Sequence, residues 1–135
     1  MTEYFGREYV EVDVDFFACP AALIAPRLIG CVLHHDERGS ETAIMLIDVE
    51  AYGGGNDRAS HLHPNNRSRR NKATKSLTPH GTTRIHGSRD MWAMDIVCGN
   101  EDPGSTVLVR AGLPIAGIEI MAERRSRADA PDRVV

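Results

Sequence analysis

Apolar and polar positions in the first half of the chain follow a helical pattern and then two extended ones. Leu23, Ile24 and Leu28 recur at helical spacing behind Pro20, and Gly30 is placed to end that helix. Two apolar runs separated by a polar turn follow, and the second, TAIMLIDV, is typical of a buried strand. The pattern therefore predicts, in order, a helix, a strand, a turn and a strand at residues 20–30, 31–34, 36–40 and 42–49.

The second half of the chain begins with a long polar stretch, residues 58–81, which is expected to be a loop. The apolar runs after it predict a strand, a tight turn, two further strands and a closing helix, at residues 82–85, 86–90, 91–98, 106–110 and 114–125. Residues 126–135 are expected to form a flexible tail. Helices and strands do not alternate regularly, so the pattern predicts a single α+β domain over residues 1–125.

Length and composition fit one small soluble domain. The chain has 135 residues, of which 41% are hydrophobic and 26% charged. No apolar run approaches the ~18 residues that a membrane-spanning helix needs. The N-terminus is acidic where a signal peptide would be basic. We therefore expect a cytoplasmic, monomeric protein with no membrane contact.

The net charge of −3 conceals an uneven distribution. Residues 57–90 carry a net +6, from eight Lys or Arg and two acids, whereas residues 1–56 carry −7 and residues 91–135 carry −2. Because a polyanion responds to charge within a Debye length of about 8–10 Å, the local cluster matters more than the total. The basic segment is either a solvated loop or a surface for a polyanion.

The cysteines are spaced too far apart to suggest a metal or disulfide framework. Cys19, Cys31 and Cys98 form no CxxC pair, so we expect reduced thiols buried in the core. The pair His61 and His63 forms an HxH motif, but no recognised metal-binding spacing surrounds it. We expect neither a metal nor another cofactor.

Glu50 is the residue whose position is most suggestive of chemistry. It follows an apolar strand and precedes the glycine loop 53–55, where a carboxylate can act as a general base. The alternative is an ordinary surface glutamate at a strand end. Arg110 closes the run TVLV, and it would reach Glu50 if their two strands were neighbours. The glycine loop lacks the frame of a phosphate-binding loop.

Five stretches, read in order, carry a family resemblance: APRLIG at 25–30, IDVEAY at 47–52, DRASH at 57–61, RSRRN at 67–71, and VLVRA followed by MAERR within 107–125. They resemble the A-R-x-L-L-G, VETEAY, D-x-A-S-H, R-T-P-R-N, VLIRALEP-x-x-G and M-x-x-R-R stretches of the alkyladenine (3-methyladenine) DNA glycosylase family. The resemblance spans about 110 residues, from Phe16 to Arg125.

The resemblance implies a curved, mainly antiparallel β-sheet flanked by helices, the formyltransferase C-terminal-domain-like fold. It also implies a monofunctional base-excision repair enzyme that flips a damaged purine out of double-stranded DNA. A water activated by a glutamate would then hydrolyse the N-glycosidic bond of an alkylated purine such as 3-methyladenine, without metal or cofactor.

By position, the resemblance implies a role for each matching residue of this sequence. Glu50 would be the general base, and Arg110 would hold Glu50 and the water. The base-binding residues would be Tyr52, His61, Ile85 and Asp95. The DNA-binding residues would be Arg67, Arg69, Arg70, Lys72, Ser88 and Arg89, which gives the basic segment a purpose.

The sequence departs from the family pattern in the predicted hairpin. Ile85 and Ser88 stand where the family has two tyrosines, one stacking on the base and one filling the gap in the duplex. Asp95 stands where the family has an asparagine, and the family's glycine-rich segment after M-x-x-R-R does not follow. Base–aromatic stacking contributes ~1–3 kcal/mol per base. Two alternatives therefore stay open: a catalytically degenerate DNA-binding module of the same fold, and a truncated product of marginal stability.

Overall fold

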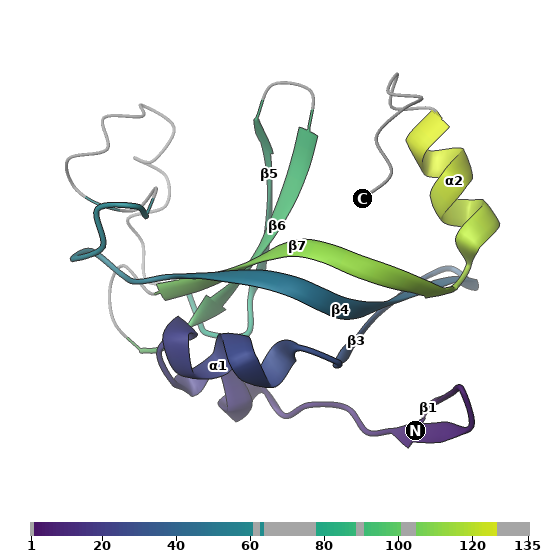
Figure 1. Ribbon diagram of the computed structural model, residues 1–135, viewed down its shortest axis with the longest axis horizontal. Coiled ribbons are helices and arrows are strands. Elements are labelled where there is room, and N and C mark those ends of the chain that lie inside the picture. The colour runs from purple at the N-terminus through teal and green to yellow at the C-terminus, as the bar shows by residue number, and fades with distance from the viewer. Residues whose placement is uncertain (1, 61–62, 64–77, 89–90, 101–104, 127–135) are drawn as a thin grey trace.

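A computed structural model of the chain describes residues 2–60, 63, 78–88, 91–100 and 105–126 (Figure 1). Its centre is a five-stranded antiparallel sheet with the strand order β3-β4-β7-β6-β5. The strands are β3 (Val32–Glu37), β4 (Ser40–Tyr52), β5 (Thr83–Ser88), β6 (Met91–Cys98) and β7 (Ser105–Ala116). The sheet and its helices confirm the predicted α+β fold.

The two longest strands, β4 and β7, lie side by side and form the spine of the sheet. β3 folds back on β4 through a turn in which Arg38 and Gly39 both adopt positive φ, at 54° and 86°. β6 pairs only with the first half of β7, as far as Met94↔Val109. The β5–β6 hairpin therefore rises away from the spine, and the sheet curls (Figure 1).

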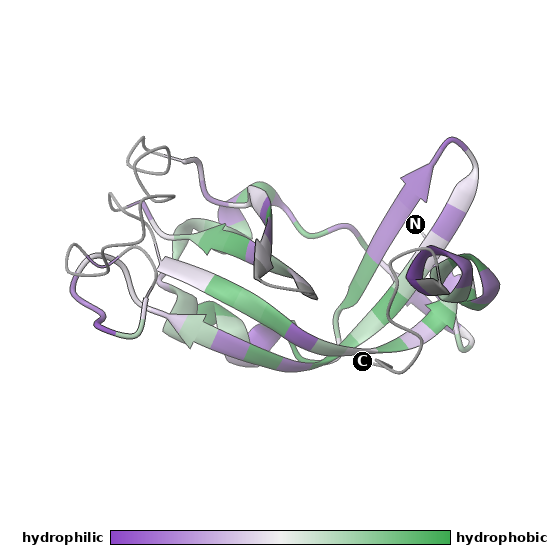
Figure 2. Cartoon of the chain, turned by 90° about the horizontal axis from the view of Figure 1, so that it is seen from above, coloured by the Kyte–Doolittle hydropathy of each residue, from purple (hydrophilic) through white to green (hydrophobic). Residues whose placement is uncertain are grey.

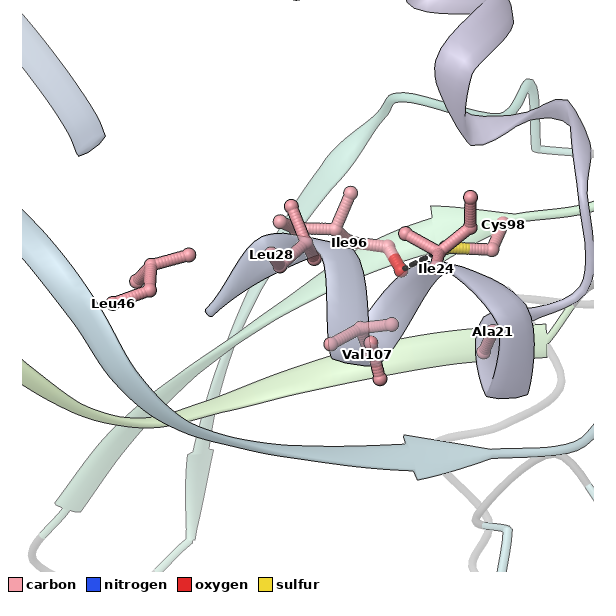
Figure 3. Close-up of a cluster of buried hydrophobic side chains, with 8 residues drawn as sticks. Ala21, Ile24, Leu28, Leu46, Ile96, Cys98 and Val107 are labelled. Carbon is pink, nitrogen blue, oxygen red and sulfur yellow. Dashed lines mark hydrogen bonds between the residues drawn. The ribbon is translucent and has the colours of Figure 1, made fainter. Parts of the chain in front are cut away.

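One helix, α1 (Ala21–Leu28), covers one face of the sheet and supplies half of the core. Its buried side chains are Ala21, Ile24, Ala25 and Leu28. They pack on sheet residues that include Leu46, Ile96, Cys98 and Val107 (Figure 3). Burying each large apolar side chain stabilises the fold by about 1.5–3 kcal/mol, so this small interface holds the helix in place.

The two ends of α1 are fixed in different ways, one by a side chain of β7 and the other by a local glycine. At its beginning the backbone N–H of Ala21 donates to Oγ of Ser105 on β7, at 2.8 Å. At its end Gly30 adopts a φ of 83°, a left-handed conformation that glycine reaches at little cost. The predicted helix and its stop at Gly30 are confirmed.

The remaining described elements lie around the sheet: β1 (Thr2–Tyr4), β2 (Arg7–Tyr9), the 3₁₀-helix η1 (Val14–Ala18) and α2 (Ile118–Ser126). The Tyr4 hydroxyl donates to Oε1 of Glu41 on β4 at 2.7 Å, which ties the N-terminal hairpin to the sheet. α2 is largely hydrophilic (Figure 2), and its Arg124 pairs with Glu37 of β3 at 3.1 Å. No helix in the described ranges is long and apolar enough to cross a membrane.

The structure corrects the predicted extent of several elements. β4 continues to Tyr52, so Glu50 lies within the strand instead of after it. β5 continues to Ser88, so the turn is shorter than predicted. Residues 114–116 belong to β7, and α2 begins only at Ile118. Pro114 fits in this strand because β6 pairs with β7 only as far as Val109, so one side of β7 needs no ladder hydrogen bond at Pro114.

The prediction that all three thiols are buried is wrong for one of them. Cys98 is fully buried and Cys31 is partly buried, but Cys19 is exposed, and all three are free. Cys19 directly follows η1, where the chain passes over the surface before α1 begins. Burial raises the pKa of the Cys98 thiol to about 11, so this side chain stays neutral in the core.

Candidate active site

Glu50 lies on the face of the sheet opposite α1. In the β4–β7 register Ala51 pairs with Val107 and Glu50 pairs with Leu108. Val107 is fully buried in the core beneath α1. Because successive side chains of a strand point to opposite faces, Glu50 and Leu108 share the other face. This face is free of α1, and polar side chains gather on it.

Two side chains hold the Glu50 carboxylate, one at each oxygen. Nη1 of Arg110 lies 3.2 Å from Oε1, and the Tyr52 hydroxyl donates to Oε2 at 2.5 Å. The hydrogen bond to Glu50 is the main cause that raises the pKa of Tyr52, followed by desolvation. The Glu50 side chain is still 39% exposed. The carboxylate is therefore oriented and also reachable by water.

A β-bulge lies at Arg110. The register passes from Val49↔Val109 to Asp48↔Ala111, which leaves Arg110 as the extra residue on β7. A continuous ladder would have paired Arg110 with Asp48. Bulges bend a strand and re-aim the side chain of the extra residue. The irregularity thus accompanies the contact of Arg110 with Glu50, the neighbouring carboxylate on this face.

A second carboxylate lies in the same row of the sheet. Leu108 pairs with Glu50 on one side and with Asp95 on the other, so the three residues share one face. Asp95 is only 9% exposed, and its Oδ2 lies 3.1 Å from Nε2 of His86 on β5. Its charge also contributes to the raised pKa of Tyr52. We call Glu50, Tyr52, His86, Asp95 and Arg110 the site cluster.

The loop after β4 is shaped by Asp57. Its carboxylate accepts the backbone N–H of Gly53 at 2.7 Å and that of Ala59 at 2.9 Å. These two bonds, that of Ala59 first, lower the pKa of Asp57. A Cβ on Gly53 would lie 2.9 Å from Cβ of Asp57, so a larger residue would push the two apart. Asp57 therefore closes a turn over residues 53–59, directly after β4.

The structure brings together four of the residues predicted for the site: Glu50, Tyr52, Asp95 and Arg110. Ile85 does not join them. It is 62% exposed and precedes His86, so it points to the opposite face of β5. Of Ser88 only the backbone is described, at the end of β5. The other predicted site residues lie outside the described residues: His61, Arg67, Arg69, Arg70, Lys72 and Arg89.

His86 was not predicted as a member of this site. The sequence pattern placed it in the turn predicted at residues 86–90. Because β5 runs to Ser88, the register Arg84↔Asp95 puts the alternate residue His86 on the face of Asp95. His86 was missed because the predicted strand ended at Ile85, whereas β5 continues to Ser88. In the described part of the chain no group of three or more His, Cys, Asp or Glu could hold a metal ion.

Comparison with known proteins points to the family that the motifs suggested. A model of the methylpurine-DNA glycosylase family matches residues 15–135. Several curated relatives carry the name "Putative 3-methyladenine DNA glycosylase". The one from Corynebacterium efficiens is 39% identical over 84% of this chain and 56% of its own length. Those from Clostridium acetobutylicum and Frankia casuarinae are 35% and 34% identical, over 82% and 84% of this chain.

The match covers most of this chain but only part of each relative. The chain spans 54% of the Clostridium protein and 51% of the Frankia protein, about half the length of the curated relatives it matches. Within that half the family match includes Glu50, Tyr52, Asp95 and Arg110. The family model matches most of the chain, and the relatives are similar over most of it as well. The chain therefore belongs to the methylpurine-DNA glycosylase family.

Proposed function

We propose that this protein is a DNA glycosylase that removes alkylated purines of the 3-methyladenine type from double-stranded DNA. The observation that carries the proposal is the Glu50 carboxylate, fixed by Tyr52 and Arg110 yet accessible to solvent. A carboxylate held in this way is suited to take a proton from water. Family membership supplies the substrate class.

The reaction is a hydrolysis with one attacking water. Glu50 accepts a proton while the water oxygen forms a bond to C1′ of the deoxyribose. The bond between C1′ and the purine nitrogen breaks, and its electron pair leaves with the base. Alkylation at N3 or N7 makes the purine cationic, so it departs as a neutral molecule. Arg110 keeps the carboxylate turned toward the water, and Tyr52 fixes its second oxygen.

The remaining predicted roles are part of the same proposal. The flipped base would lie near Tyr52, His61 and Asp95, whereas the predicted role of Ile85 does not fit its place on the opposite face of β5. The phosphates of the duplex would meet the basic side chains and the hairpin turn, through Arg67, Arg69, Arg70, Lys72, Ser88 and Arg89. Extruding a base requires a few kcal/mol of unstacking free energy, which such contacts offset.

A DNA-binding module without catalysis is the second candidate. It is favoured by the hairpin, where Ile85 carries no aromatic ring and faces away from the site cluster. The chain's single tryptophan, Trp92, is 77% exposed beside the hairpin turn, and it packs over Gly87. Its fluorescence therefore reports contact between the hairpin and DNA directly.

One experiment separates the two candidates. The protein is titrated with a duplex that carries a single 7-methylguanine, and both free base and Trp92 fluorescence are measured. We expect release of the base together with a fluorescence change. A fluorescence change without release would instead support the binding module. Neither signal at low salt would contradict both.

A further inference from the structure

We propose that Asp95 makes the site select damaged purines that carry a positive charge over neutral ones. The inference rests on the proposed function, because it concerns the base that would enter the same site. The observations behind it are the different contacts and the different burial of the two carboxylates in the site cluster, Glu50 and Asp95.

The two carboxylates have different partners. Glu50 is paired with the guanidinium of Arg110, a permanent cation. Asp95 instead contacts the imidazole of His86, which is charged only when protonated. Arg84 stands opposite Asp95 in the register of β5 and β6, but the described residues show no ion pair between them. Within the described part of the chain, the site cluster thus holds a carboxylate that no permanent cation contacts.

Asp95 is also the more deeply buried of the two. Its side chain is 12% exposed, compared with 39% for that of Glu50. Charges interact more strongly where water is excluded, and a buried charge is costly unless an opposite charge lies near it. The charge of Asp95 already acts on the Tyr52 hydroxyl, which in turn contacts Glu50. A base bound beside Glu50 would therefore also interact with the negative charge of Asp95.

Two kinds of damaged purine respond differently to that charge. A purine alkylated at N3 or N7 brings a positive charge, and Asp95 stabilises it on entry. A neutral purine such as hypoxanthine brings none, and gains nothing from the carboxylate. Asp95 acts here as a specificity-determining residue and takes no proton in the reaction, whereas Glu50 keeps the role of base.

The test compares Asp95→Asn with the wild type. The variant keeps the size of the side chain and removes its charge. Release of 7-methylguanine and of hypoxanthine from otherwise identical duplexes is measured as kcat/KM. We expect the ratio of the two to fall about tenfold, because two unit charges about 10 Å apart, at an effective dielectric constant of about 20, interact with an energy that corresponds to a factor of that order. A thermal melt verifies that the variant is folded.

Two further variants sharpen the result. Asp48→Asn removes an exposed charge from β4 and should leave the ratio unchanged. His86→Gln keeps a hydrogen-bonding side chain that cannot become charged, and should keep or increase the preference for the cationic base. An unchanged ratio in Asp95→Asn would overturn the inference. So would loss of hypoxanthine release alone in His86→Gln, because that would make His86 a proton donor for neutral bases.

The inference and the proposed function fail in different ways. If the wild type releases neither base, the proposed hydrolysis fails. The charge selection is then measured by binding, as the Kd of the two duplexes from Trp92 fluorescence. Tighter binding of the 7-methylguanine duplex that disappears in Asp95→Asn would support the inference. Equal affinities in both proteins would contradict it.

Discussion

The Glu50 carboxylate is oriented by two contacts of different kinds. Arg110 supplies a charge at Oε1, and the Tyr52 hydroxyl supplies a hydrogen bond at Oε2. The ion pair is half exposed, so solvent screens it and its contribution to folding stability is small. The ion pair acts mainly by holding the Glu50 carboxylate in position. The hydrogen bond from Tyr52 is the better candidate for a measurable contribution to catalysis, because it holds an oxygen that Arg110 does not contact.

Tyr52→Phe should slow the chemical step and leave substrate binding nearly unchanged. The variant keeps the aromatic ring and removes only the hydroxyl that contacts Glu50. A hydrogen bond to a charged group is worth about 1.5–3 kcal/mol, which corresponds to a fall in kcat of about 10- to 100-fold. Steady-state kinetics on a 7-methylguanine duplex give kcat and KM separately. A raised KM at unchanged kcat would mean that Tyr52 serves base binding alone.

Residues of the site were harder to predict the more their position depends on how far the paired strands extend. The contact between Glu50 and Arg110 was predicted on the condition that their strands were neighbours, and β4 does pair with β7. The hydroxyl contact of Tyr52 was not predicted, because it requires β4 to continue past Glu50. His86 was missed for a similar reason, since it was assigned to a turn.

At the scale of elements, strand ends were harder to predict than strand centres. The apolar centres of β4, β6 and β7 were found because their residues are buried on one face or both. The end of β7 was predicted to be helix, since Ile115, Ile118 and Met121 match a helical spacing. The structure keeps residues up to Ala116 in the strand because β4 continues to offer backbone partners there. Pairing between distant strands thus decided what local spacing could not.

The packing of α1 on the core allows a matched test. Ile24 is fully buried under α1, whereas its neighbour Leu23 is 61% exposed. Ile24→Ala should lower the free energy of unfolding by about 2–5 kcal/mol, through lost burial and a cavity. Leu23→Ala should change it by no more than about 0.5 kcal/mol. Chemical denaturation measures both. Equal effects would show that α1 does not pack as described.

At the scale of the whole molecule, the core and the site occupy opposite faces of one sheet. α1 covers one face of the sheet (Figure 1), the face that carries Val107, and the register places the site cluster on the opposite face, which carries Leu108. Substitutions in the site cluster can therefore test the proposed catalysis without opening the core. The basic segment between residues 57 and 90 joins β4 to the β5–β6 hairpin, and both contribute to the site cluster. In sequence, the basic segment thus lies between two strands that contribute to the site cluster.

Affinity for DNA should depend on salt in spite of the negative net charge. The logarithm of the binding constant falls with the logarithm of the salt concentration, with a slope of about −0.9 for each phosphate contact. Replacing Arg67, Arg69, Arg70 and Lys72 by Gln should make the slope less steep, by about 0.9 for each phosphate contact that is lost and for at most four contacts. Fluorescence titrations of Trp92 at several salt concentrations measure it. An unchanged slope would mean that the basic segment does not bind phosphates.

The most direct test of the proposed chemistry is single-turnover release of 7-methylguanine by Glu50→Gln, with Asp48→Asn as the matched control. Glutamine keeps the shape of the side chain but cannot accept the proton of the attacking water. We predict that Glu50→Gln binds the duplex with the wild-type Kd and releases the base at least about 100-fold more slowly, while Asp48→Asn releases it at the wild-type rate. Wild-type release by Glu50→Gln would contradict the assignment of Glu50 as the general base.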